Sequence, residues 1–269
     1  MLRLHSSRVT LLASLTCMGV TASASAGLIS FDPDDGYPLG TSLAGKPVGG
    51  SPQWAGDGSL WTITSLGNGG GAAQSDATSP TAFGSTRFTP DAGFLGGSTD
   101  ASGQYSYGFQ IRNDAAPDSE DFAVAHRIYL AQGNGGTAIR INVFDNGRLQ
   151  LATGSGTVNV VNGNGANFDL DDAGGRFIDV SGVIDFDTDT YTLSFDGVQQ
   201  TFNGSADLAF NAVGQTDFGQ FNLQQGGSTD ANARQISIDN LGAAVPEPGS
   251  LALLSLGGLA LLRRRSRIG

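Results

Sequence analysis

The chain has 269 residues, with 25 acidic and 14 basic side chains and a formal net charge of −11 at pH 7. An acidic surface repels nucleic acid and anionic lipid, so this charge excludes a nucleic-acid partner and suits either solubility outside the cell or cation binding. Glycine supplies 41 residues, about twice the usual ~7 %, and long helical patterns are absent, which favours an all-β protein.

The N-terminal residues have the three parts of a secretory signal peptide. Arg3 and Arg8 precede an apolar segment, Val9 to Val20, and a run of small residues follows it. The small residues Ala24 and Ala26 flank Ser25 in the pattern that signal peptidase cleaves, so residues 1–26 are predicted to be removed. An uncleaved anchor is the alternative, although the apolar segment is short for a membrane span.

Removal of the signal peptide changes the chemistry of what remains. The single cysteine, Cys17, is lost, so the exported domain must be stabilised by its core and not by disulfides. His126 becomes the sole histidine. Between Gly27 and Ala244 there are 8 basic and 24 acidic residues, a net charge of 8 − 24 = −16.

Residues 27–243 consist of short alternating segments separated by Gly, Asn and Asp turns, which predict one domain of roughly twelve antiparallel strands. Asp145-Asn146-Gly147 and Asp196-Gly197 supply hairpin turns. Three glycine-rich segments, Asp32 to Gly58, Gly67 to Pro80 and Thr89 to Ser102, are predicted to be loops. The predicted strands are Leu28–Phe31, Ser59–Leu66, Phe83–Phe88, Gln104–Arg112, Phe122–Leu130, Ile139–Val143, Leu149–Leu151, Thr157–Val161, Arg176–Phe186, Thr190–Phe195, Val198–Phe202, Asp217–Leu223 and Arg234–Leu241.

The C-terminal residues 244–269 also have three parts: a Pro-Glu-Pro motif, an apolar run from Leu251 to Leu262, and a basic cluster. As a helix the apolar run would be roughly 18 Å long, which is short for a bilayer core, and the positive cluster would stay cytoplasmic. A buried C-terminal helix is the alternative, but four arginines near the terminus fit it poorly. The residues that define the motif and the cluster are Val245, Pro246, Glu247, Pro248, Arg263, Arg264 and Arg265.

These residues resemble the PEP-CTERM sorting signal of Gram-negative bacteria. The resemblance implies recognition by an exosortase, a membrane transpeptidase-like enzyme, with cleavage near Pro246-Glu247-Pro248. It further implies transient anchoring in the inner membrane and transfer to the cell surface or to the extracellular biofilm matrix. The C-terminal segment would then be a sorting address and not a functional site of the mature protein.

The domain between the two ends resembles the concanavalin A-like (laminin-G-like) jelly rolls. The resemblance rests on the hairpin Ile184 to Gly197, on the closing strand Ile236 to Leu241, and on Gly36 to Gly40 with Trp54. It implies an antiparallel β-sandwich of two stacked sheets, and it says little about activity.

Catalytic candidates are few. Glycoside hydrolysis needs two carboxylates about 5–9 Å apart, yet Glu120 is the only glutamate of the domain. His126 shares a strand face with Val124 and Ile128, so we expect a core histidine and not a general base. Arg127 and Tyr129, the residue types that jelly-roll lyases combine with a histidine, lie on the opposite face of the same strand. The chain is therefore predicted not to be an enzyme.

A calcium site is one interpretation of the acidic residues in the predicted hairpin. Asp185, Asp187, Asp189 and Asp196 provide hard oxygen ligands, three of them at alternate positions, as calcium prefers. A hairpin turn explains the same residues without an ion, because aspartate favours turns. Asp32–Asp35 and Asp169–Asp172 are further candidates on the same grounds.

Two hypotheses about function remain. The first is a non-catalytic surface β-sandwich that binds extracellular polysaccharide through exposed Trp54, Trp61 or tyrosines. The alternative is a jelly-roll polysaccharide hydrolase or lyase with unrecognised catalytic residues, for which Glu120 and His126 are the residues to test.

Overall fold

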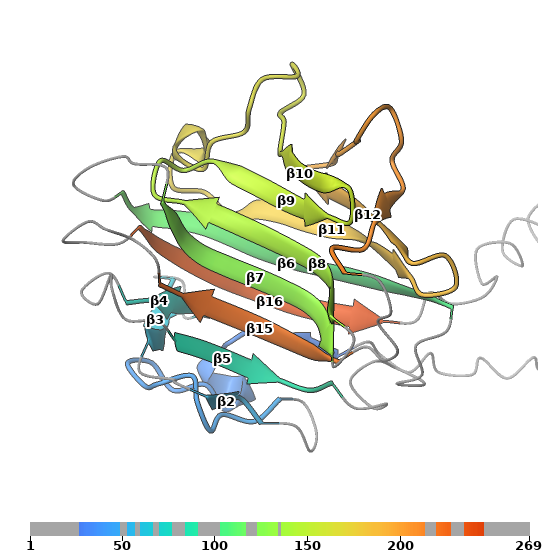
Figure 1. Ribbon diagram of the computed structural model, residues 1–269. Coiled ribbons are helices and arrows are strands. Elements are labelled where there is room, and N and C mark those ends of the chain that lie inside the picture. Colours follow the sequence, from blue (N-terminus) through green and yellow to red (C-terminus); the bar gives the residue numbers. More distant parts are fainter. Residues whose placement is uncertain are drawn as a thin grey trace, which may run out of the picture.

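The structure, a computed structural model, describes residues 27–48, 53–56, 60–66, 70–76, 84–90, 103–116, 123–133, 136–212, 219–226 and 234–244. Its strands form two antiparallel sheets, and Figure 1 shows β8, β7, β15 and β5 of one sheet side by side in front of the other. Helical structure in these residues is limited to short 3-10 segments such as η1 (Pro33–Asp35) and η3 (Asp171–Ala173). None of the described residues forms a helix long and apolar enough to cross a membrane.

The nine-stranded sheet has the order β13-β12-β11-β6-β16-β4-β3, with β1 paired to β16 and β14 paired to β12. Its central strand, β6, pairs with β11 on one side and with β16 on the other. The strands are β1 (Gly27–Ile29), β3 (Trp61–Ser65), β4 (Gly71–Ser75), β6 (Gln104–Ala115), β11 (Ile178–Asp185), β12 (Thr190–Phe195), β13 (Val198–Gln199), β14 (Leu208–Ala209) and β16 (Gln235–Ala244).

The seven-stranded sheet has the order β10-β9-β8-β7-β15-β5-β2. The β8–β9 hairpin turns at Asp145 and Asn146, as the Asn-Gly pair predicts. The strands are β2 (Ala55–Gly56), β5 (Gly84–Phe88), β7 (Val124–Gly133), β8 (Gly136–Phe144), β9 (Leu149–Thr153), β10 (Gly156–Asn159) and β15 (Gln220–Gln225).

The core lies between the two sheets and takes alternate residues from each strand. On β6, Tyr105, Tyr107 and Phe109 are at most 4 % exposed. The facing sheet contributes Phe88 and Phe221, whose rings stack with centroids 5.1 Å apart. The predicted fold class, an antiparallel jelly-roll type of β-sandwich, is therefore confirmed.

One predicted loop is wrong. Gly71–Ser75, placed in a mobile loop by its lack of bulky residues, forms β4 between β16 and β3. Its first residue must be glycine because the backbone of Phe31 lies close to it: a Cβ at Gly71 would lie 2.3 Å from the Phe31 carbonyl oxygen. The predicted strand from Val198 to Phe202 is shorter than expected, since β13 ends at Gln199.

Candidate functional site

The two tryptophans predicted to be exposed and ligand-binding are instead core residues, so that prediction is wrong. Trp54 is 1 % exposed and Trp61 is fully buried. The Trp54 ring meets Phe88 edge-on with centroids 4.7 Å apart, and its Nε1 donates a hydrogen bond to the Tyr37 hydroxyl at 3.3 Å. Trp61 shares the buried face of β3 with Ile63, an alternation that was visible in the sequence.

His126 lies in the core, as predicted from its apolar neighbours on β7. The ring is fully buried, and Nε2 lies 2.5 Å from the carbonyl oxygen of Arg234. Burial lowers the pKa of His126 to about 4, because the core disfavours the charged imidazolium. The imidazole ring meets the ring of Trp61, on the other sheet, edge-on with centroids 5.9 Å apart. It is closed off from solvent.

The aspartates of the predicted calcium site shape the β11–β12 hairpin. Asp185 Oδ1 accepts hydrogen bonds from the backbone N–H groups of Asp187 and Thr188, at 2.9 and 3.2 Å. Asp187 Oδ1 accepts one from the Gly103 N–H at 3.0 Å. The Asp185 contacts are the local backbone bonds that make aspartate favourable in turns, whereas the Asp187 contact joins the hairpin to the residue before β6.

Asp196 lies at the other end of β12, where it pairs with Arg176 through an Oδ2–Nη2 contact of 2.5 Å. The structure therefore does not bring the four predicted ligands together. In the described ranges no group of three His, Cys, Asp or Glu side chains is arranged to hold a metal ion. In the two further candidate segments, Asp32 accepts a hydrogen bond from the Gly71 N–H at 2.8 Å and Asp171 pairs with Arg234.

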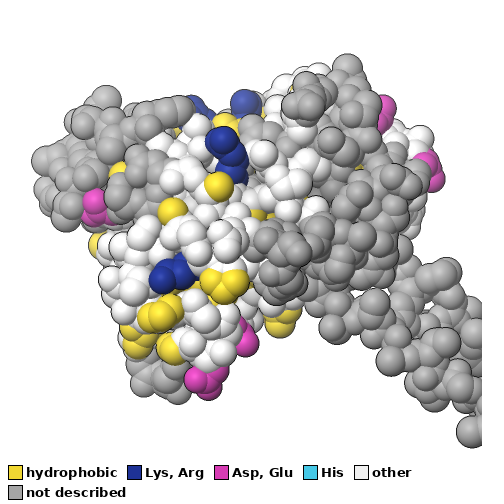
Figure 2. Space-filling view, turned by 90° about the horizontal axis from the view of Figure 1, so that it is seen from below, with side chains coloured by type: hydrophobic (Ala, Val, Ile, Leu, Met, Phe, Trp, Pro, Cys, Tyr) yellow, Lys and Arg dark blue, Asp and Glu magenta, His cyan; other side chains and the backbone are white. Residues whose placement is uncertain are grey.

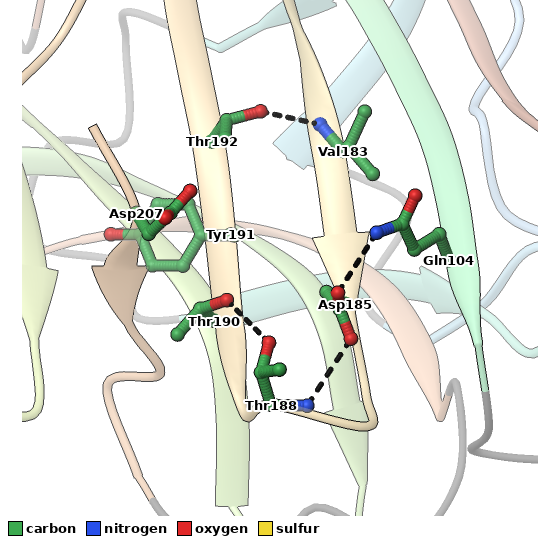
Figure 3. A pocket seen from close by; sticks show the side chains of 8 residues that line it. All are labelled: Gln104, Val183, Asp185, Thr188, Thr190, Tyr191, Thr192 and Asp207. Carbon is green, nitrogen blue, oxygen red and sulfur yellow. Dashed lines mark hydrogen bonds between the residues drawn. The ribbon is translucent and has the colours of Figure 1, made fainter.

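A surface pocket of about 450 Å³ opens beside this hairpin (Figure 3). Figure 3 shows that Gln104 donates to Asp185, and that the hydroxyls of Thr188 and Thr190 bond each other. The pocket is lined by Gln104, Val183, Asp185, Thr188, Thr190, Tyr191, Thr192 and Asp207.

The pocket has two carboxyl groups, those of Asp185 and Asp207. The hydrogen bond from Gln104, with smaller contributions from the turn N–H groups, holds the pKa of Asp185 below its usual value. A glycosidase's general acid needs a raised pKa so that it is protonated when substrate binds, so Asp185 does not fit that role. Asp185 is instead a hydrogen-bond acceptor, suited to sugar or water hydroxyls.

A second candidate surface is the outward face of the seven-stranded sheet. Ile128 and Leu130 of β7 and Ile139 and Ile141 of β8 point into the core, so the residues that alternate with them point outward. The strand registers align these outward residues in two neighbouring rows across the sheet. We call these two rows the polar face: one contains Arg87, Asn222, Tyr129 and Arg140, and the other contains Ser85, Gln224, Arg127, Asn142, Gln150 and Asn159.

The polar face is linked by side-chain hydrogen bonds between strands. Gln224 Oε1 accepts from the Tyr129 hydroxyl at 3.0 Å and from Arg127 Nη1 at 3.2 Å. Asn142 donates to Gln150, which donates to Asn159. None of the ten residues of the polar face is acidic. This composition offers amide and guanidinium groups for hydrogen bonding, but it offers no carboxylate that could serve as a proton donor or nucleophile.

The predicted signal cleavage residues, Ala24 and Ala26, and the C-terminal sorting residues lie outside the described residues, as does Glu120. Residues 244–267 match the family model described as the PEP-CTERM protein-sorting motif. The predicted sorting signal, including Val245 to Pro248 and Arg263 to Arg265, is thereby confirmed. No curated protein matches the chain in sequence.

Solved structures with a similar arrangement of strands include a sialidase, with 14 % identity and a TM-score of 0.45 over 70 % of this chain and 17 % of the sialidase. The alginate lyase from Corynebacterium sp. has 13 % identity and a TM-score of 0.42 over 68 % of this chain and 80 % of the lyase. The binding domain of Paraclostridial Mosquitocidal Protein 1 has 10 % identity and a TM-score of 0.46 over 81 % and 49 % of the two chains. Likeness at this level gives no ligand and no activity for this chain.

Proposed function

We propose that this chain, which carries the PEP-CTERM protein-sorting motif at residues 244–267, is an exported surface or matrix protein whose β-sandwich binds extracellular polysaccharide without cleaving it. The sorting motif indicates an exosortase substrate. Delivery to the surface of a Gram-negative cell, after removal of the signal peptide and transient anchoring in the inner membrane, is part of the proposal.

The observation that carries the binding role is the polar face. Amide groups both donate and accept hydrogen bonds, so a row of Asn and Gln side chains matches the mixed donor and acceptor character of sugar hydroxyls. Tyr129 adds an aromatic ring with a polar tip, the type of side chain that contacts a ligand with one apolar and one polar side. Rigid neighbouring strands hold these groups in fixed positions.

The proposed lack of catalysis rests on the same geometry. His126 is buried on the inner side of β7, away from Arg127 and Tyr129. Asp185 is kept in its acceptor form by Gln104. A hydrolase needs a protonated acid beside a second carboxylate, and the described residues of the polar face provide neither.

The experiment compares polysaccharide pull-down with product release for the processed protein, using glucan, alginate and xylan. Binding without new reducing ends or unsaturated sugar products is the expected result. Product release that is abolished by Glu120→Gln or His126→Ala would instead establish the hydrolase or lyase alternative. A protein that neither binds nor cleaves any of the three would contradict the proposal itself.

A further inference from the structure

The three arginines of the polar face differ in their partners from three other arginines of the domain. Arg112, Arg176 and Arg234 each form an ion pair with an aspartate. By contrast, Arg87, Arg127 and Arg140 form no ion pair with any described residue. Three of the eight basic residues between Gly27 and Ala244 therefore lie on one acid-free face of a chain that is otherwise strongly acidic.

Buried polar atoms on this face also lack partners. Arg140 Nε and Asn142 Oδ1 are buried and make no hydrogen bond to any described residue. Asn142 is 6 % exposed, and it lies directly across the ladder from Arg127. An unsatisfied buried polar group is costly, so a ligand that reorients these two side chains and supplies their missing partners gains affinity there.

The register places Arg87 and Arg140 in one row that crosses the strands and Arg127 in the row beside it. Arg87, Asn222, Tyr129 and Arg140 occupy successive strands β5, β15, β7 and β8. With neighbouring strands ~4.8 Å apart, Arg87 and Arg140 are roughly 14 Å apart, and Arg127 lies in the adjacent row. Positive charges spaced over this length suit an extended chain that carries anionic groups at intervals.

We propose that the polar face binds an anionic polysaccharide, with Arg87, Arg127 and Arg140 contacting its carboxylate or sulfate groups and the amides contacting its hydroxyls. This inference rests on the proposed function and specifies its ligand class. Guanidinium groups pair with planar anions through two parallel hydrogen bonds, which an ammonium group does not reproduce.

The charge of the rest of the molecule selects against nucleic acid. A net charge of −16 between Gly27 and Ala244 repels a densely charged phosphate backbone, whose binding depends on many cationic contacts. In the view from below in Figure 2, the basic side chains lie apart from the acidic ones, most of which are toward the edges. A hydroxyl-rich polymer with sparser anions fits three arginines surrounded by amides.

The test measures dissociation constants of the processed protein for alginate, a sulfated glucan, an uncharged glucan and single-stranded DNA. The variants are Arg127→Ala/Arg140→Ala and, at the exposed end of the row, Arg87→Ala. The matched control is Arg176→Ala, which removes an exposed arginine outside the polar face. Circular dichroism and thermal unfolding verify that each variant is folded, and Arg87→Ala tests the inference independently if the double variant unfolds.

We expect the double variant to weaken binding of an anionic polysaccharide roughly tenfold or more, Arg87→Ala to weaken it by a smaller factor, and Arg176→Ala to leave it unchanged. The alginate and sulfated arms identify which anion is preferred. Equal binding of the uncharged glucan, with no effect of the arginine changes, would overturn the inference while leaving the proposed function intact. Tighter binding of DNA than of either anionic polysaccharide would also overturn it, whereas no polysaccharide binding at all would reject both.

Discussion

His126 and Asp239 are buried titratable residues whose pKa values shift in opposite directions. Burial lowers the pKa of His126 to about 4 and raises the pKa of Asp239 to about 6, because the core disfavours both charged forms. Between pH 6.5 and 4 the unfolded chain protonates its histidine while the folded chain does not, so this residue reduces stability as the pH falls. As the pH falls, the folded chain protonates Asp239 at a higher pH than the unfolded chain does. This residue therefore adds stability as the pH falls over much of the same range.

Replacement of Asp239 by Asn is therefore expected to make the loss of stability between pH 6.5 and 4 steeper than in the wild type. The His126 contribution, about 3 kcal/mol over this window, is then no longer offset. Urea unfolding at pH 7, 5.5 and 4 measures the effect, with Asp34→Asn on the exposed η1 segment as the control. Parallel pH profiles for Asp239→Asn and the wild type would show that this compensation does not exist.

Whether the sequence predicted the burial of a residue depended on that residue's neighbours along the chain. His126 alternates with apolar residues along a strand, and this pattern correctly predicted its burial. Trp54 stands in a segment without any periodic pattern, and the sequence did not predict its burial. Its contacts with Phe88 and Tyr37 are tertiary contacts, which only the folded chain shows.

A glycine on β11 leaves room for a side chain of β6 to bond β12. Tyr107 of β6 lies opposite Gly182 of β11, and its hydroxyl donates to the Thr192 carbonyl oxygen on β12 at 2.7 Å. The phenol thus reaches across β11 to a strand two places away. A side chain at Gly182 would occupy this path, since its Cβ would lie 2.0 Å from the Thr192 oxygen and 2.5 Å from the Tyr107 hydroxyl oxygen.

The variant Gly182→Ala is expected to lower the free energy of unfolding by roughly 1–3 kcal/mol or more, because the added methyl group overpacks a fixed backbone site. Thermal or urea unfolding measures the loss. Ser181→Ala, one position away on the exposed side of β11, is the matched control and should change stability little. If both variants were equally stable, Tyr107 would not depend on the open space at Gly182.

Strands with bulky alternating residues were predictable as elements, and strands of small residues were not. β6, β8 and β12 were all identified, because their apolar residues recur at every second position. β4 was missed because Gly71, Ala72 and Ala73 carry no such pattern. The glycine at position 71 reflects the close approach of the Phe31 backbone, which is a tertiary contact.

At the scale of the whole molecule, the polar face was not predictable because it is produced by register. Arg87, Arg127 and Arg140 stand on different strands, and only the pairing of β5, β15, β7 and β8 brings them onto one surface. The sequence correctly indicated that Arg127 and Tyr129 share the face opposite His126. It did not show which residues of other strands would join them, since strand order requires the complete sheet.

The two ends of the chain lead to a prediction about processing. The sorting motif at residues 244–267 ends in a basic cluster, and positive residues beside an apolar run hold that end on the cytoplasmic side. We expect the processed protein to begin at Gly27 and to end near Pro246-Glu247-Pro248, as measured by intact mass after fractionation of the host. Replacement of Arg263, Arg264 and Arg265 by Ala should leave the C-terminal segment uncleaved, because its apolar run loses the flank that orients it. Arg176→Ala should be processed normally, and normal termini in the triple variant would show that the basic cluster does not direct processing.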